Sequence, residues 1–412
     1  MNNTIINLLA ILLLLTTCSN NKKKGSTLAA NVNRESKPEI VPSIKPTVKV
    51  YIENSGSMDG YVKGTTEFEQ TVYNYLSDIK ISDFTDSLNL YYVNSKIIPQ
   101  GSDISDFIEK LEPSTFSIKG GNRGTSDISN VLKSVLSEMK NNEIAILVTD
   151  GIFSPGKGKN AGEYLVNQQI GIKNTMAEYL KLYPNTAVKM YQLASRFDGL
   201  FFNREDTKIY INSQRPFFIW VIGHVEQLKK LCSKVPDSKF KGGGAKNIFS
   251  ITTGNKIINY AFKNGSGNFD LDHYSPKTTI NNLGTDSKGK TETVRFSVNA
   301  DLSGFLLDDN YLLNISNYEI NNKDFNFTIS KALSNNFGYT HLLNFSSTRV
   351  HKGIVSIKLK TKIPKWVEAV NDDDGLQQIP DKTYGIKYQI QGVYEAFSRN
   401  NDFYTEIILN IK

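Results

Sequence analysis

The chain has 412 residues, of which 39% are hydrophobic and 11% are aromatic. This composition supplies a large buried core, so it excludes a disordered chain and favours two folded domains. The formal net charge of +7 is spread over many loops rather than concentrated in one segment. Because nucleic-acid recognition needs a concentrated basic face with interleaved aromatic side chains, we expect no nucleic-acid partner.

The N-terminus contains a short apolar run, residues 5–15, directly before Thr16-Thr17-Cys18. The run is too short for a confident membrane-spanning helix. It resembles a bacterial lipoprotein signal, which implies that residues 1–17 are removed and that Cys18 carries lipid. An ordinary signal peptide and an uncleaved anchor are the alternatives. Ser19 is not the aspartate that signals inner-membrane retention, so the resemblance favours the outer membrane and leaves open which face the protein occupies.

Residues 18–46 are polar, rich in Asn, Lys and Ser, and contain prolines toward their end. Such a composition predicts a flexible tether that lifts the folded part off the membrane. The other cysteine, Cys232, lies in an amphipathic helical pattern and is interpreted as a core residue. With Cys18 lipidated, no intrachain disulfide is expected.

Strand and helix patterns alternate over residues 47–235, which favours an α/β fold with a doubly wound, mainly parallel sheet and helices on both faces. In a sheet of this type the ligand crevice lies at the carboxyl ends of the strands. The predicted strands are 48–53, 88–93, 144–149, 188–194 and 217–222, and the predicted helices are 68–79, 104–111, 128–139, 161–182 and 225–235.

The first of these strands ends in Glu53, and Ser55 and Ser57 follow at alternate positions. Residues two apart point the same way where a strand enters a loop, so these three side chains can converge on one point. Hard oxygen donors of this kind suit Mg²⁺ or Mn²⁺. Two later segments add donors: Thr125 follows a glycine-rich loop, and Asp150 ends the apolar run 144–149.

In this order the three segments resemble the von Willebrand factor A-domain family, whose metal-ion-dependent adhesion site is written Asp-x-Ser-x-Ser, then Thr, then Asp. Ser55 and Ser57 match the two serines, Thr125 the threonine and Asp150 the final aspartate, whereas Glu53 is one methylene longer than the family's first residue. The resemblance implies that the hydroxyls surround Mg²⁺ or Mn²⁺ and that the carboxylates supply negative charge. Glu53 could bind the metal directly, displace a bridging water or crowd the site.

Residues 197–213 have the pattern of a β-hairpin between the last two predicted strands of this domain. The hairpin is either a specificity element or an extension of the sheet. Residues 236–412 lose the alternation with helices, and short β-like runs separated by polar turns predict an antiparallel, sandwich-like domain. One helix, 383–397, is expected to pack against the sandwich. Its predicted strands are 293–298, 311–315, 325–329, 341–345, 353–358 and 404–411.

Other chemistries are less well supported by the sequence. The loop 120–125 lacks the ending of a P-loop, neither serine lies in a Gly-x-Ser-x-Gly frame, and the four histidines show no zinc-binding spacing. The run Asp372-Asp373-Asp374-Gly375 lacks the spaced ligands of a calcium loop and is interpreted as a solvated turn.

These patterns predict a lipid-anchored extracytoplasmic binding or adhesion protein that is not an enzyme and whose metal engages an acidic side chain of a protein partner. The alternative is a metal-independent scaffold of a cell-envelope assembly. In that case Glu53 and Asp150 would share a crevice without a cation, and their repulsion would raise one pKa. A metal-dependent hydrolase is a third hypothesis, in which the metal would activate water.

Overall fold

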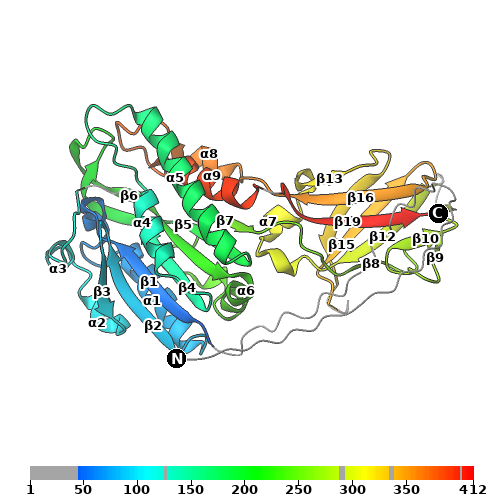
Figure 1. The fold of residues 1–412 in the computed structure, drawn as a ribbon, viewed down its shortest axis with the longest axis horizontal. Coiled ribbons are helices and arrows are strands. Elements are labelled where there is room, and N and C mark those ends of the chain that lie inside the picture. Colours follow the sequence, from blue (N-terminus) through cyan, green and yellow to red (C-terminus); the bar gives the residue numbers. More distant parts are fainter. Residues whose placement is uncertain (1–44, 125–127, 287–292, 334–337, 400) are drawn as a thin grey trace, which may run out of the picture. The chain divides into compact units, whose positions relative to one another are not determined.

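The computed structural model describes residues 45–124, 128–286, 293–333, 338–399 and 401–412 (Figure 1). The predicted signal segment, Cys18 and nearly all of the predicted tether lie outside these residues, as does Thr125. Within the described ranges, no helix combines the length and apolar character needed to cross a membrane.

A mixed seven-stranded sheet forms the centre of the α/β part, in the order β3-β2-β1-β4-β6-β5-β7. Strand β1 is parallel to β2 and β4, whereas β3, β6, β5 and β7 join through antiparallel pairs. The strands are β1 (Thr47–Glu53), β2 (Ser87–Val93), β3 (Ile97–Gly101), β4 (Glu143–Thr149), β5 (Thr186–Phe202), β6 (Lys208–His224) and β7 (Asn247–Thr252).

The prediction of a mainly parallel sheet is therefore wrong, although the mixed α/β class is correct. The physical reason is the length of two connections. A parallel pair needs a crossover of a dozen or more residues, whereas β2 and β3, and likewise β5 and β6, are joined by short turns that permit only antiparallel pairing. The predicted strands 188–194 and 217–222 are the inner parts of β5 and β6, each of which has 17 residues.

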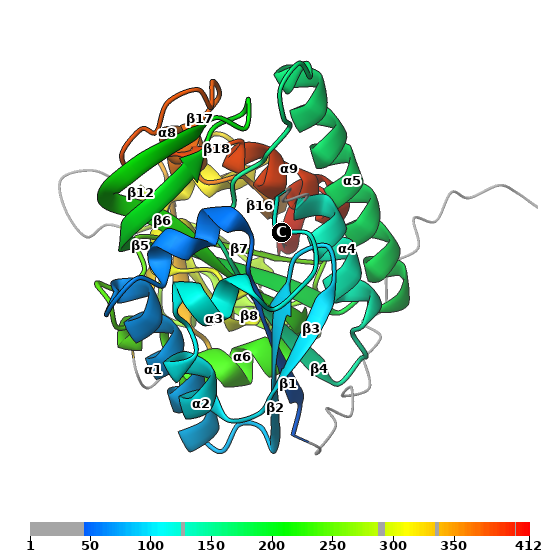
Figure 2. The same ribbon diagram turned by 90° about the vertical axis from the view of Figure 1, so that its left-hand side faces the viewer.

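Helices cover both faces of this sheet. Along β1, Tyr51 packs into one hydrophobic cluster and Val50 into another, as the period of two in a strand requires. Helices α4, α5 and α9 lie on one side of the sheet, and α1 and α2 lie on the other (Figure 2). The helices of the α/β part are α1 (Glu67–Ile81), α2 (Ile104–Glu109), α3 (Pro113–Ser117), α4 (Ile128–Ser137), α5 (Ala161–Leu182) and α6 (Val225–Lys234), with the 3₁₀ helices η1 (Gly56–Tyr61) and η2 (Asp237–Lys239).

The hairpin near residues 197–213 is a direct continuation of β5 and β6, which pair without interruption from Thr186 with His224 to Phe202 with Lys208. Its base lies against η1, where Gly60 and Gly199 permit a close approach. A Cβ on Gly60 would lie 2.5 Å from the Phe197 ring, and one on Gly199 would lie 2.8 Å from the Gly60 Cα. The hairpin therefore lies directly on the loop that follows β1.

The tip of the hairpin is attached to the aspartate-rich turn. Arg204 forms an ion pair with Asp374 at 3.0 Å, and its N–H donates to the Gly375 carbonyl at 2.8 Å. Asp372 is buried and accepts bonds from two N–H groups of the turn, and Asp373 pairs with Lys387 at 2.7 Å. The three carboxylates thus have different partners, and the prediction of a solvated turn holds for the exposed Asp373 and Asp374 but not for the buried Asp372. The turn lies between the two-stranded pair β17 (Asn371–Asp372) and β18 (Thr383–Tyr384).

The rest of the chain is rich in β structure, with two five-stranded sheets. Phe296 and Leu343 of one sheet and Ile357 and Leu409 of the other belong to the same hydrophobic cluster. One sheet has the order β13 (Tyr318–Ile320), β16 (Gly353–Lys360), β19 (Phe403–Ile411), β10 (Thr279–Asn281) and β9 (Asp270–Leu271), and the other consists of β11 (Thr285–Asp286), β12 (Thr293–Ala300), β15 (His341–Ser347), β14 (Asn326–Lys331) and β8 (Tyr260–Phe262), which pairs with β12.

The predicted strand 311–315 is wrong, because this segment is helical. Asp308 accepts a hydrogen bond from the Tyr311 N–H at 2.8 Å, and an aspartate at this position caps a helix. The short helices of this part are η3 (Ser303–Phe305), α7 (Asp309–Leu312), η4 (Ile315–Asn317) and α8 (Trp366–Val370).

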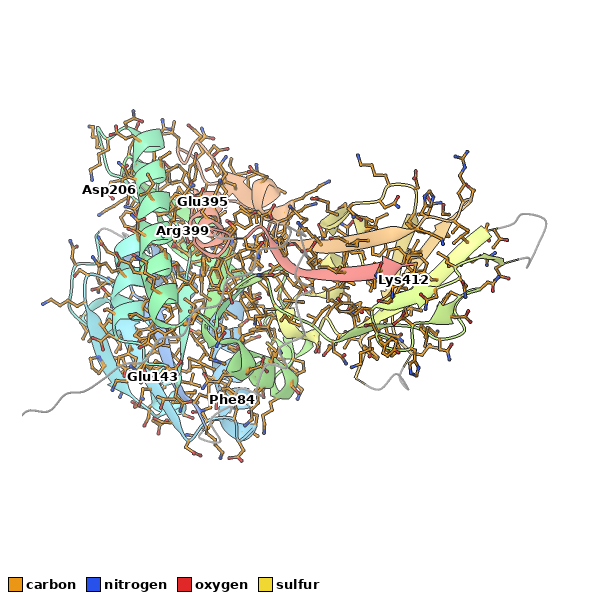
Figure 3. The ribbon with its side chains drawn as sticks, turned by 45° about the vertical axis from the view of Figure 1, so that its right-hand side comes forward. Phe84, Glu143, Asp206, Glu395, Arg399 and Lys412 are labelled. Carbon is orange, nitrogen blue, oxygen red and sulfur yellow. The ribbon has the colours of Figure 1, made fainter. Side chains whose placement is uncertain are left out.

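Helix α9 (Ile386–Phe397) forms where a helix was predicted, but it packs against α5 of the α/β part instead of against the β-rich sheets. Glu395, labelled in Figure 3, pairs with Lys173 at 2.9 Å and accepts a bond from Gln169 at 2.7 Å. The Gln389 amide donates to the Gly151 carbonyl at 2.6 Å. Helix α9 is thus held against the strand end that leads into the candidate site.

Candidate metal site at the ends of β1 and β4

The candidate site lies where two parallel strands end at the same edge of the sheet. Glu53 is the last residue of β1, and Asp150 follows directly after β4. Ile52 pairs with Val148, so Glu53 stands opposite Thr149 and Asp150 follows one residue beyond, at the same edge of the sheet. Glu53 is 1% exposed and Asp150 is fully buried. Such buried carboxylates need compensation by a cation, by a proton or by hydrogen bonds.

Glu53 is oriented by the neighbouring strand. The Thr149 hydroxyl donates a hydrogen bond to the Glu53 carboxylate and accepts one from the Gly151 N–H at 2.9 Å. A glutamate is long enough to reach Thr149 across the strand pair. One carboxylate oxygen of Glu53 thus has a fixed protein partner.

The two serines of the motif converge, as their alternate spacing predicted. Their hydroxyl oxygens lie 3.0 Å apart, and the side chains of Ser55 and Ser57 are both buried. In an octahedral magnesium shell with bonds of about 2.0–2.1 Å, two adjacent ligands stand about 2.9 Å apart. The spacing of the two hydroxyls therefore suits adjacent ligands of one small cation as well as a direct hydrogen bond.

Asp150 has an available oxygen. Its Oδ1 accepts a bond from the Ile152 N–H at 3.1 Å, whereas its buried Oδ2 has no hydrogen-bond partner among the residues that the structure describes. Burial raises the pKa of the Asp150 carboxyl, and the charge of Arg215, the Ile152 N–H and the nearby Ser57 hydroxyl partly oppose this shift. An unpartnered buried carboxylate oxygen is the kind of donor that a hard cation would satisfy.

The loop before Thr125 is fixed to the serine loop by Arg123. Its Nε donates to the Asn54 carbonyl at 2.7 Å, and its guanidinium also pairs with Asp59. In return the Gly56 N–H donates to the Arg123 carbonyl at 3.0 Å. Thr125 itself is outside the described residues, but Gly124, which precedes it, lines the same small cavity as Ser55 and Ser57.

That cavity has a volume of about 10 Å³, which is room for roughly one water molecule. Phe202, from the outer part of the hairpin, forms one wall and would contact a Cβ on Gly56 at 3.4 Å. The outer part of the hairpin therefore narrows the small cavity that the two serines line.

Arg215 is a buried cation beside the site that the sequence pattern did not reveal. Its side chain is 2% exposed, and its guanidinium carbon lies 4.6 Å from the centre of the Phe197 ring and 4.9 Å from that of Phe201. Within the described ranges, its Nε and Nη1 have no hydrogen-bond partner, and no carboxylate lies within 4 Å. Its charge nevertheless reaches Asp150 and stabilises the ionised form of that group.

Two asparagines support the strand ends and were also missed. The Asn94 side-chain amide donates to the side-chain Oδ1 of Asn54 at 2.8 Å and to the Gly120 backbone carbonyl at 2.9 Å. Both residues directly follow a strand, β1 or β2. Polar residues immediately after two buried strands were a signal in the sequence that could have identified them.

The residues present fit a hard divalent cation. The donors are the two serine hydroxyls, the free oxygen of Asp150 and the Glu53 carboxylate, all of which are oxygens. Among the described residues, no group of three or more His, Cys, Asp or Glu side chains could hold a metal. Any metal here would thus depend on hydroxyl donors as well as on carboxylates.

No protein-family model, curated protein or solved structure matches this chain. The class is therefore described by the fold and the site alone: a mixed α/β sheet that carries a buried cluster of hydroxyl and carboxylate oxygens at the ends of parallel strands, joined to a β-rich part.

Proposed function

We propose that this is a lipid-anchored extracytoplasmic binding protein that uses a modified metal-ion-dependent adhesion site to engage a protein partner. The observation that carries the proposal is the pair of hydroxyls, Ser55 and Ser57, 3.0 Å apart beside the unpartnered oxygen of Asp150. The resemblance of these segments to the von Willebrand factor A-domain family supports it. In this proposal Ser55, Ser57 and Thr125 would hold Mg²⁺ or Mn²⁺, with Glu53 and Asp150 supplying charge directly or through water.

The local charges support an acidic partner group. Glu53 and Asp150 contribute two negative charges, a divalent cation would cancel them, and buried Arg215 would leave the site with a net positive charge. Arg123 does not change this sum, because it is paired with Asp59. A carboxylate of a partner protein would be attracted to such a site. Salt would screen this attraction least where the contact is buried.

Calorimetric titration of the full chain with MgCl₂ or MnCl₂ tests the metal directly. We expect saturable binding and a rise in the melting temperature for the wild type, and neither effect for Asp150→Ala. Ser55→Ala should weaken binding because it removes one hydroxyl donor, whereas Ser137→Ala, on the exposed face of α4, is the matched control. Wild-type protein that shows no metal-dependent stabilisation would contradict the metal assignment.

Glu53→Asp distinguishes the roles of the first carboxylate. Tighter metal binding would mean that the longer glutamate weakens the site, and unchanged binding would mean that the carboxylate acts through water. Because the shorter side chain also withdraws from Thr149, the variant's metal-free stability must be measured beside its affinity.

The second candidate is a metal-independent scaffold, and Arg215 is the observation that favours it. A buried guanidinium near Asp150 offsets negative charge without any metal. Crosslinking in the native cell with and without EDTA separates the two candidates. The adhesion proposal expects partner capture to be lost with the chelator, whereas a scaffold keeps the same partner.

The envelope location is proposed from the N-terminal sequence. Labelled palmitate should be incorporated into the wild type and not into Cys18→Ala, and the variant should leave the outer-membrane fraction. Palmitate labelling that persists in Cys18→Ala would contradict lipidation at this cysteine.

A further inference from the structure

A second cavity shares no lining residue with the cavity at the strand-end site, and the types of its lining residues differ. It has a volume of about 600 Å³, within the range of about 300–1,000 Å³ that is usual for small-molecule sites. It lies between the edge strand β7 on one side and α7, η4 and the segment 362–366 on the other. Its wall contains aromatic rings, amides and ammonium groups, and these residue types together define what it can bind.

Two aromatic side chains in this wall are held in place through their polar atoms. The Trp366 indole N–H donates to the Ile248 carbonyl at 3.3 Å, and the Tyr311 hydroxyl donates to the Lys360 carbonyl at 2.6 Å. Each ring is half-buried and lines the cavity. A ring held in this way offers an apolar surface to a ligand. Little conformational entropy is lost on binding, because the rotamer of the ring is already fixed.

The cavity is also positively charged. Its lining contains Lys246, Lys362 and Lys365 against a single carboxylate, Asp308, so three positive charges less one negative charge leave a net charge of +2. Asp308 is already engaged in capping α7. Lys246 and Lys365 are exposed, and neither ammonium has an anionic partner within 4 Å in the part of the chain that the structure describes. Both are therefore available to an anionic ligand.

A buried polar group lies beside this cavity. Ser250 is 8% exposed and lines the cavity, and its hydroxyl has no hydrogen-bond partner among the described residues. An unpaired buried hydroxyl costs free energy, and because this oxygen is shielded from solvent, a ligand reaches it only if the local packing shifts.

The edge strand itself argues against an extended peptide as the ligand. The carbonyls of Ile248 and Ser250 point away from β5, and they already accept hydrogen bonds from Trp366 and from the Tyr404 hydroxyl, the latter at 3.2 Å. A peptide that added a strand to β7 would need those carbonyls as acceptors. The remaining chemistry consists of aromatic platforms, amide and hydroxyl groups, and ammonium groups.

We propose that this cavity binds an acidic saccharide, meaning a sugar unit that bears a carboxylate or a phosphate. The ring of Trp366 or Tyr311 would contact the apolar face of the sugar, and Lys246 and Lys365 would bind the anionic group. The site is separate from Glu53 and Asp150 and does not depend on a metal, so it stands or falls independently of the adhesion proposal.

The chain allows a direct optical test, because it contains only two tryptophans. Trp220 is buried in β6, so Trp220→Phe leaves Trp366 as the single reporter. This variant is titrated with glucuronic acid, galacturonic acid and glucose 6-phosphate, and in parallel with glucose, inorganic phosphate and hexaglutamate at constant ionic strength. We expect a saturable change in Trp366 emission with at least one acidic sugar. Its apparent Kd should be at least about tenfold below the values for glucose, inorganic phosphate and hexaglutamate.

Adding Lys246→Ala and Lys365→Ala should weaken the binding of the acidic sugar by about tenfold or more, since charge-assisted contacts are lost. Lys133→Ala with Lys181→Ala, on the exposed faces of α4 and α5, is the matched control and should change nothing. Four outcomes would overturn the proposal: no saturable response to any acidic sugar, an equal response to phosphate alone, an equal response to hexaglutamate, or full binding by the Lys246 and Lys365 double variant.

Discussion

The hydroxyl of Thr149 donates a hydrogen bond to the carboxylate of Glu53 across the parallel pair of β1 and β4. The same hydroxyl accepts from the Gly151 N–H, so a single side chain joins both strand ends of the candidate site. All three residues are buried. The geometry of the site is therefore fixed from inside the sheet as well as by its loops.

Thr149→Val removes this hydroxyl without changing the shape of the side chain. Because it removes the bond to the Glu53 carboxylate and the bond from the Gly151 N–H, both in a buried place, we expect a loss of about 1–3 kcal/mol in the free energy of unfolding. Urea denaturation followed by circular dichroism measures it. Thr149→Ser keeps the hydroxyl and is the control; equal losses in the two variants would show that packing, and not the hydrogen bond, is responsible.

Asp150 should make the stability of the metal-free protein depend on pH. Burial raises its pKa, so the folded state holds a proton that the unfolded state releases near pH 4. The contribution of Asp150 to stability is therefore greatest below about pH 4 and is lost as pH rises through the folded-state pKa. In EDTA, Asp150→Asn should gain stability relative to the wild type as pH rises from 4 to 8. A difference between the two proteins that does not vary with pH would contradict this assignment.

The contact of the hairpin with η1 should not tolerate a side chain on Gly60. A Cβ there would lie 2.5 Å from the ring of Phe197, which is itself fully buried and cannot move aside. We expect Gly60→Ala to cost about 1–3 kcal/mol by overpacking. Gly162→Ala, near the start of α5, has only one neighbour at 3.6 Å and serves as the control. Thermal unfolding of both variants makes the comparison, and equal melting temperatures would show that the hairpin shifts freely.

We expect the pKa values of two glutamates in the first turn of α1 to be shifted in opposite directions. Burial raises the pKa of Glu69 to about 7, against the opposing effect of the Thr66 N–H. Glu67 is also partly desolvated, but the bond from the Arg196 N–H at 2.8 Å and further contacts leave its pKa below the usual value. Carboxyl carbon chemical shifts in an NMR titration would report both. A midpoint for Glu69 below pH 5 would contradict the desolvation.

The sequence predicted those parts of the molecule that depend on local patterns. The apolar runs of β1 and β4 lie where they were predicted, because burial on both faces of the sheet favours a continuous apolar strand, and helix α5 occupies the predicted range 161–182. The strand ends then place Glu53 and Asp150 at one edge, and the Ser55 and Ser57 hydroxyls lie together although Ser57 belongs to η1 and not to the strand.

What the sequence did not predict depends on partners that are distant along the chain. Arg215 approaches the site only because β6 inserts antiparallel beside β4, and strand order leaves no local periodicity. Phe202 reaches the serine loop because β5 continues unbroken beyond the edge of the helical layers. The apolar run at Tyr311 is too short to distinguish a strand from a helix by its periodicity. In the structure Asp308 caps a helix there.

Helix α9 follows α5 by about two hundred residues, yet it packs against α5 and bonds to Gly151 next to the candidate site. Its contacts join residues separated by more than two hundred positions. Such non-local contacts slow folding, because closing a long loop costs conformational entropy before the contact can stabilise the chain. A nascent chain that has not yet extended past Phe397 leaves α5 and the Gly151 carbonyl without their partners on α9, so the strand-end site can mature only after residues 386–397 have been synthesised.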